Sequence, residues 1–144
     1  MINEGMSVLS AGTYASPDDI EWAISIFAAV GETTVIEEKL MDAVTGVSGS
    51  GPAYLFALAE AMTNAGLNEG LDQENADLLV RQTLLGAAIL LAGSKESPME
   101  LREAVTSPNG TTAAALSVFE DRAFQDLIID AISAATDRAG ELGS

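Results

Sequence analysis

The chain has 144 residues, of which 48% are apolar and 5% aromatic, so it is long enough for one domain with an apolar core. It contains no cysteine and no histidine, which excludes disulfides, thiolate chemistry, the Ser–His–Asp triad and the commonest zinc ligand. Its 22 acidic and six basic residues give a formal charge of −16, which argues against a nucleic-acid partner.

Acidic residues do not form a recognisable metal site in the sequence. The cluster of Asp18, Asp19 and Glu21 lacks the loop spacing of a calcium site, and we expect no bound metal. No apolar run is expected to cross a bilayer, and no basic, apolar leader opens the chain. We therefore expect a cytoplasmic protein with no membrane partner.

The opening of the chain predicts a strand, a helix and a second strand. Residues 6–10 form the first strand candidate, and Ser16 with Asp19 is typical of a capping box at a helix start. Gly31 is expected to stop this helix, and the β-branched residues 33–36 predict a second strand. Two strands and one helix do not make a stable domain, so this segment is expected to be the end of a larger sheet.

From residue 40 onward the apolar periodicity is helical. A helix begins near Leu40, is interrupted by the small residues 48–51, resumes at Pro52 and is expected to end at Gly66.

Asp72 is expected to cap a long helix that runs to about Ala92. Apolar residues surround this helix almost completely, a pattern typical of a helix buried on all sides. Because so short a chain can hardly enclose such a helix, we expect a second chain to cover it. Further helices are predicted from the capping box at Ser97, from about Thr112 and from about Arg122.

Two segments rich in small residues are candidates for function. In 45–54 the small residues permit close approach by another backbone or by a flat ligand, but from composition alone a helix kink with a tight helix contact is the preferred explanation. In 105–112, Asn109 and Gly110 can adopt left-handed conformations just before a helix, where converging N–H groups suit a carboxylate. For the segment taken by itself, an ordinary turn with a threonine N-cap is the preferred explanation.

Both segments also resemble the signature stretches of one enzyme family. Residues 42–54 (DAVTGVSGSGPAY) are very similar to the first signature of pyrroline-5-carboxylate reductases, and residues 101–112 (LREAVTSPNGTT) are similar to the second. The helix around 86–88, the closing 134–138 and the opening 4–6 fit the same family. The resemblance covers essentially the whole chain.

The resemblance implies an amino-terminal Rossmann domain for NADPH or NADH, followed by an all-helical domain that interlocks with a second subunit. On this pattern residues 1–38 are a β–α–β remnant of the Rossmann sheet, and 39–144 form the helical dimerisation and substrate-binding domain. The expected fold is mainly α, and the expected assembly is a homodimer or an oligomer of dimers.

The implied function is the last step of proline biosynthesis, the NAD(P)H-dependent reduction of 1-pyrroline-5-carboxylate to L-proline. By resemblance, the substrate-binding residues are Ser107, Asn109, Gly110, Thr111 and Thr112. Thr112 is the expected catalytic residue, with its hydroxyl on the ring nitrogen, while Thr45 and Ser48 approach the nicotinamide. A cyclic imine can arrive protonated, so the protein mainly orients it and needs no histidine.

Two features depart from the family pattern. Asn109 stands where the family usually has a second glycine, and asparagine tolerates a positive φ. No GxGxxG follows a strand, so we expect the main cofactor site to be absent and the chain to be inactive alone. A non-catalytic oligomerisation or carboxylate-binding module of the same fold is the alternative. A third hypothesis is another imine or hydroxy-acid reductase with a similar helical domain. The resemblance of residues 107–112 to one family argues against it.

Overall fold

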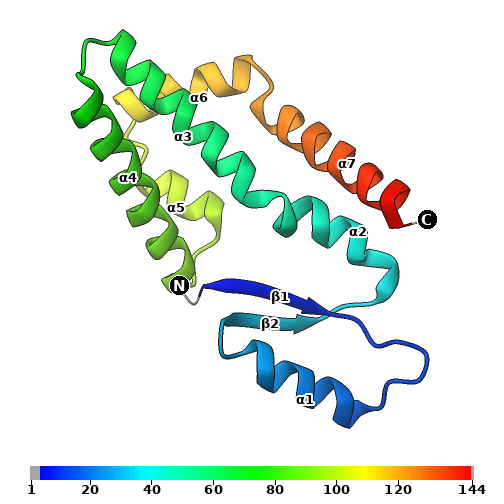
Figure 1. Cartoon of the computed structure of the whole chain (residues 1–144). Coiled ribbons are helices and arrows are strands. Elements are labelled where there is room, and N and C mark those ends of the chain that lie inside the picture. Colours follow the sequence, from blue (N-terminus) through cyan, green and yellow to red (C-terminus); the bar gives the residue numbers. More distant parts are fainter. Residues whose placement is uncertain (1–3, 144) are drawn as a thin grey trace. The chain divides into compact units, whose positions relative to one another are not determined.

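The computed structural model describes residues 4–143. Its elements are mostly helices, preceded by a short parallel sheet, which confirms the expected mainly α fold with a β–α–β opening (Figure 1). The chain divides into two compact units. One comprises the residues up to Pro52 and those from Ile129 onward, and the other comprises Ala53–Ile128.

The first unit opens with strand β1 (Gly5–Leu9), helix α1 (Pro17–Phe27) and strand β2 (Gly31–Val35). The two strands are parallel, with Gly5 opposite Gly31 (Figure 1). Parallel neighbours cannot be joined by a tight turn, and α1 supplies the crossover between them.

Helix α1 begins as predicted but ends earlier. The amide of Asp19 donates to the Ser16 hydroxyl at 3.3 Å, and the Asp19 carboxylate accepts from the Ser16 amide at 2.9 Å, which completes the capping box. The predicted stop at Gly31 is wrong, because the helix ends at Phe27 and Gly31 is the first residue of β2. Gly31 has φ 151°, and a Cβ there would collide with the backbone of Gly5. Pairing between the strands, and not helix termination, therefore requires this glycine.

The next segments in chain order are the 3₁₀ turn η1 (Glu38–Leu40), helix α2 (Met41–Val44), the π-helical turn η2 (Thr45–Gly49) and helix α3 (Gly51–Asn68). The predicted interruption at 48–51 therefore begins three residues earlier, at Thr45. It is a widened turn, in which the amide of Ser50 donates to the carbonyl oxygen of Thr45 at 2.8 Å. Such π-turns often occur at functional sites.

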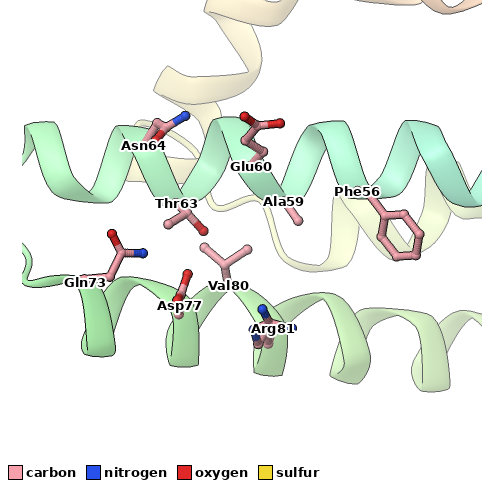
Figure 2. Close-up of a pocket in the computed structure, with 9 residues that line it drawn as sticks. All are labelled: Phe56, Ala59, Glu60, Thr63, Asn64, Gln73, Asp77, Val80 and Arg81. Atoms are coloured by element: carbon pink, nitrogen blue, oxygen red, sulfur yellow. The ribbon is translucent and has the colours of Figure 1, made fainter.

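The second unit is helical. It contains most of α3, followed by α4 (Gln73–Gly93), α5 (Pro98–Ala104), α6 (Thr111–Asp121) and the first residues of α7 (Phe124–Gly143). Helices α3 and α4 lie side by side (Figure 2). The capping box predicted at Ser97 is present, with the amide of Glu100 donating to its hydroxyl at 3.3 Å.

The turn between α3 and α4 corrects a second glycine prediction. Helix α3 does not stop at Gly66 but runs to Asn68, and the left-handed residue after it is Gly70, with φ 96°. A Cβ on Gly66 would lie 3.2 Å from Leu71 Cδ1 and 3.5 Å from Ala76 Cβ. Gly66 thus permits close packing at the start of α4 instead of ending α3.

Helix α4 is capped by Asp72 as predicted, since the amide of Asn75 donates to the Asp72 carboxylate at 2.8 Å. The expected burial is not supplied by this chain. Among the described residues, Ala76 and Val80 are the only buried hydrophobic side chains. The large apolar side chains that α4 leaves exposed are Leu78, Leu79, Leu85, Ile89, Leu90 and Leu91.

By length and composition alone, α4 could also cross a membrane, contrary to the expectation from the sequence. The core helix of a soluble protein has the same composition, so this property carries little weight. The apolar surface of α4 is compatible with cover from a second protein chain.

Candidate functional site

The residues predicted to bind substrate form one tight turn before α6. The Gly110 amide donates to the carbonyl oxygen of Ser107 at 3.0 Å, and Asn109 between them has φ 59°. Pro108 followed by a left-handed residue is typical of a type II turn. Asn109 therefore takes the left-handed conformation that the sequence predicted, whereas Gly110 does not, because its φ is −79° and its ψ is 172°.

Gly110 is required for space and not for its backbone conformation. A Cβ at this position would lie 3.1 Å from the carbonyl oxygen of Ser107 and would collide with the Ser107 hydroxyl oxygen. The missing side chain lets the Ser107 hydroxyl lie beside the first turn of α6.

The N-terminus of α6 is open. Its N-cap residue is Gly110, which has no side chain to cap the helix, so the threonine N-cap considered from the sequence is wrong. Within residues 4–143, the amides of Thr111, Thr112 and Ala113 have no acceptor, because they belong to the first turn of the helix. Three free N–H groups at the positive end of a helix suit a carboxylate.

Three other helices of the chain begin differently. Their first turns are closed by side-chain oxygens of their own N-cap residues, which are Ser16 in α1, Asp72 in α4 and Ser97 in α5. The open start of α6 thus differs from the starts of these three helices, although α2 also lacks a side-chain cap at its N-cap residue Leu40.

Exposure differs among the predicted substrate-binding residues. Ser107, Asn109 and Thr111 are exposed, while Gly110 and Thr112 are half-buried. A molecule can thus reach the turn from solvent, and Thr112 is partly shielded. Partial shielding strengthens a hydrogen bond between its hydroxyl and a bound molecule.

The segment expected near the nicotinamide forms the π-helical turn η2. Thr45 is exposed, and its hydroxyl donates to the carbonyl oxygen of Met41 at 3.0 Å. Ser48 is half-buried, and Gly46 between them is buried. A Cβ on Gly46 would lie 3.0 Å from the carbonyl oxygen of Ile132 in α7. Of the explanation considered from the sequence, the tight helix contact is present, and the helix is interrupted by the π-helical turn.

The two candidate segments belong to different units of the chain. Ser107 to Thr112 lie together at one turn of the second unit, and Thr45 and Ser48 lie in one turn of the first unit.

The connection between β1 and α1 does not fit the pyrophosphate of a dinucleotide. The first turn of α1 already holds the Asp19 carboxylate, and hydrogen bonds from the Ser16 hydroxyl and amide lower the pKa of that carboxyl below its ordinary value of 3.8. A hollow at the carboxyl ends of the strands is lined in part by Glu37 and Glu38, whose charges oppose a phosphate. The nicotinamide end of a cofactor is uncharged in its reduced form, so the charges of these carboxylates do not oppose it in this way.

A second hollow, of about 400 Å³, lies between α3 and α4 (Figure 2). The buried Val80 contributes to its lining, and Glu60, Asp77 and Arg81 are its charged residues. None of the predicted site residues lines it.

Two residues at the η2 turn were not singled out from the sequence. They are Gly46, within the first signature, and Thr136 of α7, whose hydroxyl donates to the carbonyl oxygen of Ile132 at 2.9 Å. A glycine inside a helical pattern usually has a packing reason, and this was the available signal for Gly46. Nothing in the sequence around Thr136 indicates the contact.

The family described as Pyrroline-5-carboxylate reductase dimerisation matches residues 38–142 of the chain. Among curated proteins, the chain is 44% identical over 142 residues to a pyrroline-5-carboxylate reductase from Synechocystis and 45% identical over 143 residues to one from Pseudomonas aeruginosa. Each match covers 99% of this chain but 53% and 52% of the respective relative. The chain thus spans about half the length of the curated relatives it matches.

Solved structures agree with these matches. A pyrroline-5-carboxylate reductase from Coxiella burnetii superposes with a TM-score of 0.93 at 39% identity, covering 98% of this chain and 53% of that one. A pyrroline carboxylate reductase from Plasmodium falciparum with NADP bound superposes with a TM-score of 0.90 at 31% identity, covering 99% and 58%.

Proposed function

The chain belongs to the pyrroline-5-carboxylate reductase family, and from this we propose that it is the substrate-binding and subunit-joining part of such a reductase. The reaction is the NAD(P)H-dependent reduction of 1-pyrroline-5-carboxylate to L-proline. The single observation that best supports this role within the chain is the open N-terminus of α6 behind the Ser107–Gly110 turn.

The open helix start is proposed to hold the substrate carboxylate. Its free amides on Thr111, Thr112 and Ala113 point outward from the first turn, where the helix dipole favours a negative charge. The Ser107 hydroxyl, kept close by Gly110, adds a further donor. Thr112 lies within this turn and is half-buried, so its hydroxyl is proposed to bond the ring nitrogen next to the bound carboxylate.

The reaction needs no strong acid or base from a protein side chain. A bound reduced nicotinamide supplies hydride to the imine carbon, and the ring nitrogen carries the proton. The residues of this chain therefore bind and orient the ring, in keeping with a sequence that contains no histidine and no cysteine. Thr45 and Ser48 are proposed to contact the nicotinamide. The pyrophosphate is proposed to bind outside residues 4–143, because the start of α1 does not accept it.

A second copy of the chain is proposed to cover α4. The family is named for dimerisation, and the exposed apolar side chains of α4 need cover that the single chain does not provide. Residues 1–38 are proposed to be the end of a dinucleotide-binding domain and 39–144 the helical dimerisation domain. The proposed compartment is the cytoplasm, and the cofactor is proposed to be NADPH or NADH.

The test compares two substrates in the complete reductase that carries this chain. NADPH oxidation is followed with 1-pyrroline-5-carboxylate and with 1-pyrroline, which has the same imine but no carboxylate. We expect the carboxylate to raise kcat/KM by about 100-fold, as for a charge-assisted contact. Equal rates with both imines would contradict the carboxylate site, and no turnover with either would contradict the enzyme assignment.

The alternative, a non-catalytic module of the same fold, has one observation in its favour. The helix that follows strand β1, α1, has its start closed by the Asp19 carboxylate and offers no site for a pyrophosphate. A non-catalytic module predicts that proline or pyrroline-5-carboxylate binds without any NADPH oxidation, so the same assay separates the two functions.

A further inference from the structure

The π-helical turn η2 is fixed by three contacts around Thr45. The Thr45 hydroxyl donates to the carbonyl oxygen of Met41 at 3.0 Å, and its carbonyl oxygen accepts from the amide of Ser50 at 2.8 Å. The third contact comes from the next residue, Gly46, which is buried against α7. All of these residues lie in the first compact unit of the chain.

The contact between Gly46 and α7 leaves no room for a side chain. A Cβ on Gly46 would lie 3.0 Å from the carbonyl oxygen of Ile132 and 3.2 Å from the amide nitrogen of Thr136, and it would collide with the Thr136 hydroxyl. Two of these neighbours are backbone atoms of a helix, which cannot yield locally. The Thr136 hydroxyl is itself held, because it donates to the carbonyl oxygen of Ile132 at 2.9 Å.

We propose that Gly46 is a positioning residue, which docks η2 on α7 through Ile132 and Thr136 and so fixes Thr45 and Ser48 for the nicotinamide end of the cofactor. The contact is one-sided. Gly46 is buried, whereas its neighbours Thr45 and Val47 are exposed. Any group larger than hydrogen at position 46 displaces the turn that carries the two hydroxyls. The inference rests on the proposed function, because it concerns how the cofactor-facing turn is held.

The test is made in the complete reductase, with the Gly46→Ala variant and direct NADPH binding followed by the fluorescence of NADPH itself. We expect the Kd for NADPH to rise several-fold, with a smaller change in the KM for pyrroline-5-carboxylate. Thr136→Ala in the Gly46→Ala background removes the hydroxyl that collides with the new Cβ, and we expect it to restore part of the NADPH affinity.

The matched control is Gly140→Ala, at a glycine of α7 itself. A Cβ on Gly140 would lie 3.3 Å from the Asp42 carboxylate, which is the mobile end of a side chain and can move away. We therefore expect Gly140→Ala to bind NADPH as tightly as the unaltered enzyme does. If Gly46→Ala does not fold, Thr136→Val provides a milder variant, since it removes the hydrogen bond to Ile132 while keeping the shape of the side chain.

Two results would overturn the proposal. One is unchanged NADPH affinity in folded Gly46→Ala and Thr136→Val enzymes. The other is a fall in thermal midpoint with equal losses for both substrates, which is the behaviour of a structural contact alone. Failure of the proposed function has a different signature, because the unaltered enzyme would then show no turnover of pyrroline-5-carboxylate.

Discussion

The amide of Gly110 donates a hydrogen bond to the carbonyl oxygen of Ser107 across 3.0 Å, and this bond closes the turn directly before α6. Asn109 inside the turn has φ 59°, a conformation that side chains with a Cβ rarely adopt. The turn brings the Ser107 hydroxyl to an uncapped helix start. The geometry of the proposed carboxylate site therefore depends on the residue at position 109.

Asn109→Ala should weaken the site. Alanine in the left-handed region costs about 1 kcal/mol, so we expect lower stability by this amount and a higher KM for pyrroline-5-carboxylate. Asn109→Gly is the matched variant, because glycine adopts positive φ freely and should preserve both quantities. Urea unfolding and steady-state kinetics measure the two effects. Equal behaviour of the alanine and glycine variants would show that the backbone conformation is not required.

Thr112→Ala should affect turnover more than folding. Loss of a hydrogen bond to the protonated imine is expected to lower kcat/KM by about 10- to 100-fold, whereas the half-buried threonine adds little to stability. Ser117→Ala, an exposed residue of the same helix, is the control and should leave the kinetics unaltered. A Thr112→Ala enzyme with wild-type kcat/KM would remove Thr112 from the proposed reaction.

Leu85→Glu should prevent subunit association. Leu85 is 54% exposed in the single chain, and we propose that a second copy covers it. Burying an unpaired carboxylate costs several kcal/mol, so light scattering should show monomers or unfolded chains. Gln82→Glu on the same helix changes the charge at an already polar position, and it should stay associated. A Leu85→Glu variant with the unaltered solution mass would exclude this surface as the interface.

Gly66→Val should destabilise the packing between α3 and α4. A Cβ at this position already lies 3.2 Å from Leu71 Cδ1, and two further methyl groups overfill the space. We expect a loss of about 1–3 kcal/mol in the free energy of unfolding, measured with urea. Gly93→Ala is the control, since a Cβ there meets no atom within 4 Å. Equal stability of the two variants would mean that the Gly66 contact relaxes freely.

Helix content should fall in acid. The carboxylates that cap α1, α4 and α5, those of Asp19, Asp72 and Glu100, have pKa values below their ordinary ones because they accept hydrogen bonds. A lowered folded pKa stabilises the fold above the unfolded value, here 3.8 for aspartate and 4.5 for glutamate, and this contribution disappears as the pH falls through the folded pKa.

Circular dichroism should therefore show constant helix content down to about pH 5 and a decrease below about pH 4. Asp72→Asn provides the control for α4, because asparagine is also a good N-cap but does not titrate in this range. An acid transition that begins well above pH 5 would show that other groups govern it.

Local sequence signals predicted the helix starts well. Ser16, Asp72 and Ser97 cap their helices as expected, because a capping residue acts on amides only two or three positions away. Gly31 and Gly66 were wrongly predicted to end helices. Gly31 is required by the backbone of Gly5 in the neighbouring strand, and Gly66 is required by close contact with Leu71 and Ala76, which follow it in the chain. In the sequence, a glycine that ends a helix cannot be distinguished from a glycine that permits close packing.

Local sequence signals also predicted part of the candidate site. Asn109 predicted a left-handed residue from its own chemistry, but the sequence did not predict that Gly110 would be the uncapped N-cap of α6 and would leave space for the Ser107 hydroxyl. The small residues 48–51 predicted an interruption near Thr45, but not that Gly46 packs against Ile132 and Thr136, almost ninety residues away.

Helix α4 contributes Ala76 and Val80, which are the only buried hydrophobic side chains among residues 4–143. If a second copy completes the core, folding and association are one equilibrium, governed by mass action. The thermal midpoint of the chain should then rise with protein concentration, and dilution alone should unfold it. In a cell, a newly made chain would remain unfolded and sensitive to proteases until it bound a second copy. The folded fraction would therefore depend on the concentration of the protein.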